Sequence, residues 1–184
     1  MIKETTKNNW RALGIHFALS IIGFISFVLL SLFTYSIFPD IQGVPYWTEL
    51  PLFLTPIVGG SLIYTYCGYR FLKPSEKNPI LSVWLLTAVT VLAGVIVVAD
   101  LLRSDIMDVG SAHVLVFANT LGFAILSLFA MRNDGLLTLS VLSPLLVVIA
   151  SLIPSTLLYL GLKLRIRKEK NVVIDEQELS DEEA

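Results

Sequence analysis

The chain has 184 residues, of which 55% are hydrophobic and only 15% are charged, and its mean hydropathy is +0.76. Soluble domains are typically about one quarter charged, so this composition argues against an ordinary water-soluble enzyme and also excludes a largely disordered chain. The formal net charge of −2 argues against a basic nucleic-acid binder. A single cysteine, Cys67, is too few for an intrachain disulfide or a multi-cysteine metal site. A small polytopic membrane protein is the class that remains.

Long stretches without a charged residue predict transmembrane helices. A helix that crosses a hydrocarbon core about 30 Å thick needs roughly 20 apolar residues. Backbone polar groups in lipid must be paired within their own segment, which requires helices, and runs such as VLAGVIVVA do not alternate as barrel strands do. We therefore expect an all-α integral membrane protein, a bundle of about five hydrophobic helices with four to six crossings. The five segments are residues 12–38, 51–69, 80–99, 112–130 and 136–162.

The first of these segments resembles a signal sequence in one respect, because the basic residues Lys3, Lys7 and Arg11 precede it. Its apolar run is much longer than the roughly 7–15 residues of a signal-peptide core, and no small-x-small cleavage motif follows it. We interpret it as a retained signal-anchor helix. From the preceding basic residues we expect the N-terminus to lie in the cytoplasm, and we expect the protein to be located in the cell membrane.

The basic residues expose a conflict in the number of crossings. A five-crossing chain divides them seven to six between the two sides, so it has no preferred orientation. An even number of crossings instead gathers at least eleven of them on one side. Two arrangements supply an even number. In the first, segment 112–130 is re-entrant or interfacial, and in the second, segment 136–162 folds as a short hairpin at Pro144 and Pro154.

The end of the sequence differs from the rest. Residues 1–170 form the predicted transmembrane domain, which closes with the basic cluster at residues 163–170. Residues 171–184 hold six acidic residues and no basic one. Charge blocks of this kind are usually solvated and unstructured, so we predict a disordered acidic tail.

Candidate chemistry is sparse in this sequence. No catalytic or cofactor-binding motif is present, and we predict neither a catalytic residue nor a cofactor. The acidic connection after the third segment includes Asp105 and Asp108, and His113 follows at the start of the fourth segment; these residue types bind cations. Their spacing matches no metal motif, so solvated loop residues are the favoured interpretation. His16 lies about one turn inside the first segment, where we expect it to reach the interface.

Polar residues within the apolar segments are candidates for helix packing or for a pocket. Asn119 is the one strongly polar amide, and Gly122 beside it completes a small-xxx-small step with Ala118. Gly14 and Ala18 form a similar step. Packing is the favoured role. In the pocket alternative, the lining includes Asn119, Ser61, Thr65, Tyr64, Thr87 and Thr90.

These observations support two functions. The first is a non-enzymatic accessory or regulatory membrane subunit, which acts through the lipid bilayer, other membrane proteins or self-association and has no nucleic-acid partner. It is favoured by the lack of catalytic motifs, the small size and the charged terminal segments. The alternative is a small-solute binding or transport subunit with a pocket between the helices, favoured by the glycine and proline interruptions.

Overall fold

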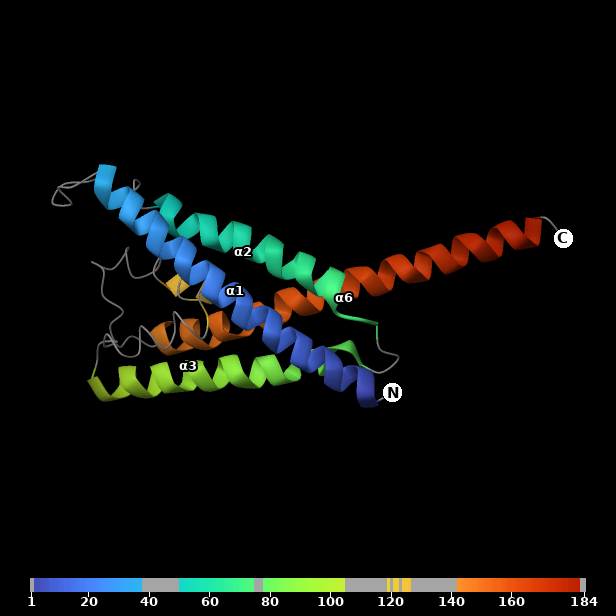
Figure 1. Cartoon of the computed structure of the whole chain (residues 1–184). Helices are drawn as coiled ribbons and strands as arrows, with labels where there is room; N and C mark the ends of the chain where they lie inside the picture. Colours follow the sequence, from blue (N-terminus) through green and yellow to red (C-terminus); the bar gives the residue numbers. More distant parts are fainter. Residues whose placement is uncertain are drawn as a thin grey trace.

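The computed structural model describes residues 2–37, 50–74, 78–104, 119, 121–122, 124–126 and 142–182. These residues form helices and no strand, which confirms the all-α prediction. Residues 121–122 and 124–126 are also helical. The long elements, in chain order, are α1 (Ile2–Ile37), α2 (Leu50–Phe71), the short 3-10 helix η2 (Pro79–Ser82), α3 (Trp84–Ser104) and α6 (Leu142–Glu182) (Figure 1).

The long helices cover four of the five predicted segments, with shifted ends. Helix α1 begins ten residues before the apolar run, because its polar first turns are held by hydrogen bonds to other parts of the chain. The predicted segment 80–99 is divided between η2 and α3, which continues to Ser104. Most of segment 112–130 lies outside the described residues.

The four long helices run alternately in opposite directions (Figure 1). As a result, residues 2–11, 70–74, 78–84 and 163–172 lie at one end of the bundle, which we call the basic end. Hydrogen bonds from Asn8 to Lys73 and from Arg165 to Leu72 join these three parts of the chain. The chain leaves α3 and enters α6 at the opposite end (Figure 1).

Helix α6 is continuous from Leu142 to Glu182, with Pro154 inside it. The hairpin alternative for segment 136–162 is therefore wrong for its described part. Pro144 lies in the first turn, where a missing N–H removes no helical bond. The helix also continues through residues 171–182, for which the sequence predicted disorder. Extending a formed helix avoids the cost of nucleation, and glutamate, glutamine and leucine are good helix formers.

The closest helix pair is α2 with α6, which cross at two glycines. A Cβ atom on Gly68 would overlap the backbone of Leu158, and one on Gly161 would overlap the backbone of Thr65 and Tyr69. Helix α3 approaches α6 in a similar way, since a Cβ on Gly94 would overlap the Ser151 side chain. Small residues permit backbones to approach closely in this manner. At Gly14, by contrast, an added Cβ would have no atom within 4 Å, so no other described helix packs against Gly14 in the predicted Gly14–Ala18 step.

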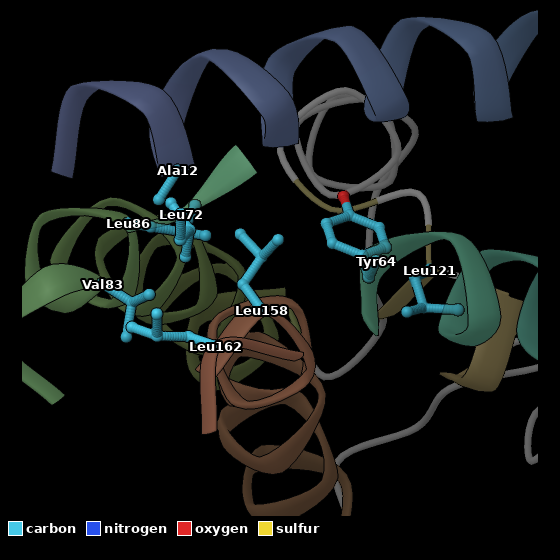
Figure 2. Packing of buried hydrophobic residues seen from close by; sticks show 8 residues of the cluster. All are labelled: Ala12, Tyr64, Leu72, Val83, Leu86, Leu121, Leu158 and Leu162. Carbon is cyan, nitrogen blue, oxygen red and sulfur yellow. The ribbon is translucent and has the colours of Figure 1, made fainter. Parts of the chain in front are cut away.

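Two clusters of buried residues form the core. The larger one lies toward the basic end and joins all four long helices, and its members include Ala12, Tyr64, Leu86, Leu158 and Leu162 (Figure 2). The smaller one joins α3 and α6 to the short helical stretch through Val97, Leu126 and Val147. Helix α6 therefore contributes to both clusters and lies centrally in the packing.

We expect Gly68→Ala and Gly161→Ala to destabilise the protein by about 1–3 kcal/mol each, because the added methyl forces two helices apart. Gly14→Ala and Gly59→Ala are the controls, since open space surrounds both positions. These controls are expected to be neutral or stabilising by up to about 1 kcal/mol, the helix-propensity gain of alanine over glycine. The measurement is thermal unfolding of the purified variants. Equal effects at all four positions would contradict the α2–α6 crossing.

Candidate functional site

A cavity of about 200 Å³ lies between α1 and α2. Most of its lining is aliphatic, and glycines leave part of the space open. Ser26, Thr55 and Tyr64 supply its polar groups. Of the six residues of the pocket alternative, only Tyr64 lines this cavity. The lining residues are Leu19, Ile22, Gly23, Ser26, Leu30, Thr55, Gly59, Gly60, Ile63, Tyr64 and Leu121.

A buried polar pair lies at the wall of this cavity. The Tyr64 hydroxyl points toward α1 (Figure 2) and is 2.8 Å from His16 Nδ1. Ser20, one turn along α1 from His16, is also buried. His16 is only 2% exposed, so the expectation that it reaches the interface is wrong. The expectation relied on the position of His16 near a helix end, and this position does not reveal that Tyr64 of α2 lies against the His16 side chain.

Asn119 joins the short helical stretch to α6. Its Nδ2 donates to the Ala150 carbonyl at 2.8 Å, and its Oδ1 accepts from the Gly122 N–H at 2.8 Å. The second bond is that of a helix N-cap. The bond to the Ala150 carbonyl follows from Pro154. A proline has no N–H, so Pro154 cannot donate to the carbonyl four residues earlier in the helix, which is that of Ala150. Asn119 therefore replaces the helical hydrogen bond that Pro154 removes.

The other predicted polar residues form bonds within their own helices. The Thr87 hydroxyl donates to Val83, and the Thr90 hydroxyl donates to Leu86 and Thr87. The Ser61 carbonyl accepts from the Thr65 hydroxyl. None of Ser61, Thr87 and Asn119 lines the cavity, and Thr90 is fully buried.

The weak metal candidates Asp105, Asp108 and His113 lie outside the described residues. Among the residues that the structure describes, no group of three His, Cys, Asp or Glu side chains could hold a metal ion.

The sequence analysis missed a polar clamp at the basic end, formed by Asn8 and Asn9. Asn8 Nδ2 donates to the Lys73 carbonyl at 2.7 Å, and Asn8 Oδ1 accepts from the Lys73 N–H at 3.1 Å. Asn9 Nδ2 donates to the Leu81 carbonyl at 2.7 Å, and Asn9 Oδ1 accepts from the Leu85 N–H at 3.0 Å. Asn9 thus caps the first turn of α3 from another helix. The feature of the sequence that could have indicated this clamp is the pair of adjacent asparagines before an apolar run.

Arg165 has a corresponding role at the C-terminal end of α2. Its Nη1 donates to the carbonyls of Arg70 and Leu72, at 3.4 and 3.1 Å, and its Nε pairs with Glu169 at 2.8 Å. The last carbonyls of a helix have no partner within that helix. A side chain from α6 therefore holds the end of α2.

No protein-family model, curated protein or solved structure matches the chain. Two described helices, with apolar windows at Glu4–Leu30 and Pro144–Val172, are long and apolar enough to cross a membrane by length and composition.

We expect the effects of Asn119→Ala and Pro154→Ala on stability to be coupled. Asn119→Ala should cost about 1–3 kcal/mol in the parent protein, because it removes the partner of a buried carbonyl. In a Pro154→Ala background, the alanine at position 154 supplies an N–H that restores the helical bond to Ala150. The same Asn119 substitution should then cost less by about 0.5–2 kcal/mol. Unfolding of the four proteins in the cycle measures this difference.

The matched control is a second cycle, in which Thr156→Ala takes the place of Asn119→Ala. The exposed hydroxyl of Thr156 bonds only to Leu152 of its own helix. Additive effects are expected in the Thr156–Pro154 cycle. If the Asn119–Pro154 cycle is equally additive, with no coupling free energy between its two substitutions, the compensating role of Asn119 is refuted.

Proposed function

We propose that the protein is a four-crossing integral protein of the cell membrane that acts as a non-enzymatic accessory or regulatory subunit through protein partners. The observation that carries this proposal is the course of α6, whose first half packs in the bundle and whose second half extends away from the other described helices (Figure 1). The extension covers residues 163–182, roughly 30 Å of helix at 1.5 Å per residue.

The outer surface of the bundle supports the membrane location. No Asp, Glu, Lys or Arg occurs in residues 12–37, 50–69, 79–99 or 142–162. Large apolar side chains are exposed on every long helix, among them Phe17, Leu62, Leu92 and Ile149. A soluble protein rarely exposes an apolar surface of this extent, whereas a bilayer solvates it.

The arrangement of the basic end supports an even number of crossings. The chain leaves α3 and enters α6 at the same end of the bundle, so segment 112–130 makes no net crossing in this proposal (Figure 1). The basic residues of three separate parts of the chain then share one side, which the positive-inside rule assigns to the cytoplasm. Residues 2–11 and 163–182 both face the cytoplasm in this orientation.

The polar groups of the bundle support a non-enzymatic role. In the part of the chain that the structure describes, Asn8, Asn9, His16 and Asn119 all form hydrogen bonds between separate parts of the chain. These side chains hold the helices together. A charged surface available to a partner lies on the extension of α6, where Arg167, Lys168 and Lys170 are exposed.

Site-specific photocrosslinking in native membranes tests this proposal. A photoreactive residue at Val172, on the exposed extension, is expected to yield a discrete protein adduct. The same residue at Leu92, which is 63% exposed on α3, is expected to yield lipid adducts. Both probes lie on exposed helical positions, so a difference between their adducts reflects the surroundings of each position and not its accessibility. Identical labelling at both positions, or a protein adduct at Leu92 alone, would contradict the proposed role of the extension.

The cavity between α1 and α2 favours a second candidate function, the binding of a small apolar solute. Its volume of about 200 Å³ suits a small ligand, and its aliphatic lining with a few hydroxyl groups is typical of ligand pockets. A transport role would build on the same cavity.

Gly59→Leu tests this candidate, because Gly59 lines the cavity and a Cβ at this position would have no other atom within 4 Å. The leucine is expected to fill the space and abolish the thermal stabilisation that apolar compounds give to the parent protein. Gly14→Leu is the matched control, since Gly14 is equally unobstructed and does not line the cavity. If no apolar compound in a screen raises the unfolding temperature of the parent protein, the solute-binding candidate is eliminated.

A further inference from the structure

A second hollow lies at the basic end, between the end of α2 and the start of the α6 extension. Its volume is about 440 Å³. We call it the basic notch, and its lining residues are Tyr69, Arg70, Arg165, Lys168, Glu169 and Val172. Three cationic side chains from two helices thus surround one opening, together with a single carboxylate.

The hydrogen bonds of the notch leave its positive charge in excess. Glu169, the only acidic residue of the lining, is paired with Arg165 in an ion pair of 2.8 Å. Arg165 also holds the carbonyls of Arg70 and Leu72, where the negative end of the α2 dipole would otherwise repel an anion. Arg165 is therefore a positioning residue, and Arg70 and Lys168 supply the remaining positive charges of the lining.

The position of the notch identifies the kind of anion. In the proposed membrane orientation, the charge-free stretches of α2 and α6 end at Tyr69 and Leu162, next to the notch. Phe71 and Trp84 are more than half exposed at the same end of the bundle, as is usual for side chains at a membrane interface. The notch therefore lies at the level of the lipid headgroups.

We propose that the basic notch binds the phosphate of an anionic phospholipid headgroup. Arginine binds phosphate through paired N–H donors, and lysine adds a point charge. Tyr69, which also lines the notch, carries a hydroxyl that can donate a further hydrogen bond. Basic pockets between membrane helices on the cytoplasmic side are suited to such headgroups. This inference rests on the proposed membrane location.

The test uses the purified full chain in mild detergent, with short-chain phosphatidylglycerol as the probe and phosphatidylcholine as the neutral lipid. Phosphatidylglycerol is expected to raise the unfolding temperature, and phosphatidylcholine is not. The double variant Arg70→Gln/Lys168→Gln should weaken binding at least about tenfold, as expected for the loss of charge-assisted hydrogen bonds.

The matched control is Arg167→Gln/Lys170→Gln, which removes the same charge from exposed positions of α6 outside the notch. It should change the affinity less than about twofold. Equal losses in both double variants would mean general electrostatic attraction and would overturn the site, as would unchanged binding in both. The unfolding temperature without lipid verifies that each variant is folded.

Two further arms distinguish other ligands. If inorganic phosphate stabilises the protein as strongly as phosphatidylglycerol, the lipid assignment is overturned in favour of a soluble anion. If a synthetic peptide of residues 171–184 competes with the lipid more strongly than phosphate does, the notch is a docking site for an acidic protein segment. Alkaline extraction of native membranes separates the two proposals. If alkaline treatment extracts the chain, the membrane location is refuted. If the chain is retained but the two double variants lose equal lipid affinity, only the headgroup site is refuted.

Discussion

The pairing of backbone polar groups where a helix ends or is interrupted is the constraint on which this structure depends. A buried carbonyl or N–H without a partner costs more than most single contacts contribute. Pro154 creates such a carbonyl at Ala150, and Asn119 pairs with it. Arg165 does the same for the last carbonyls of α2, and Asn9 for the first turn of α3. In each case the partner comes from a different part of the chain, so satisfying the backbone also connects the helices.

These directed bonds supply what apolar packing lacks. Contacts among leucine and valine side chains are largely non-directional, and they tolerate several registers of one helix against another. A hydrogen bond such as that of His16 with Tyr64 is formed in only one register. The glycine crossing of α2 with α6 adds a steric requirement at Gly68 and Gly161. Together these features favour a single arrangement of four helices whose charge-free stretches expose mainly apolar side chains.

The helices could be predicted from the sequence because an apolar run without charges is a local property. The partners of the polar residues could not, because they are distant in the chain. Asn119 is 31 residues from Ala150, and Asn8 is 65 residues from Lys73. Asn119 was recognised as unusual, but its role depends on Pro154 lying opposite. His16 was expected at the interface because nothing near it in the sequence indicates Tyr64. The cavity shares only Tyr64 with the predicted pocket, since most of its other walls are aliphatic residues and glycines, and its two further hydroxyls, those of Ser26 and Thr55, were not among the predicted lining residues.

The course of α6 bears on how the protein would act in the accessory role that we propose. The same continuous helix packs against α2 at Gly161, bonds to Asn119 at Ala150 and extends beyond the bundle. A partner that shifted the extension along its axis would have to move Gly161 against the α2 backbone, where no space is available. A close-packed interface of this kind resists small displacements. For the proposed membrane subunit, the packing therefore favours recruitment, in which the bundle would hold the extension at the membrane surface, over transmission of a movement through the bundle.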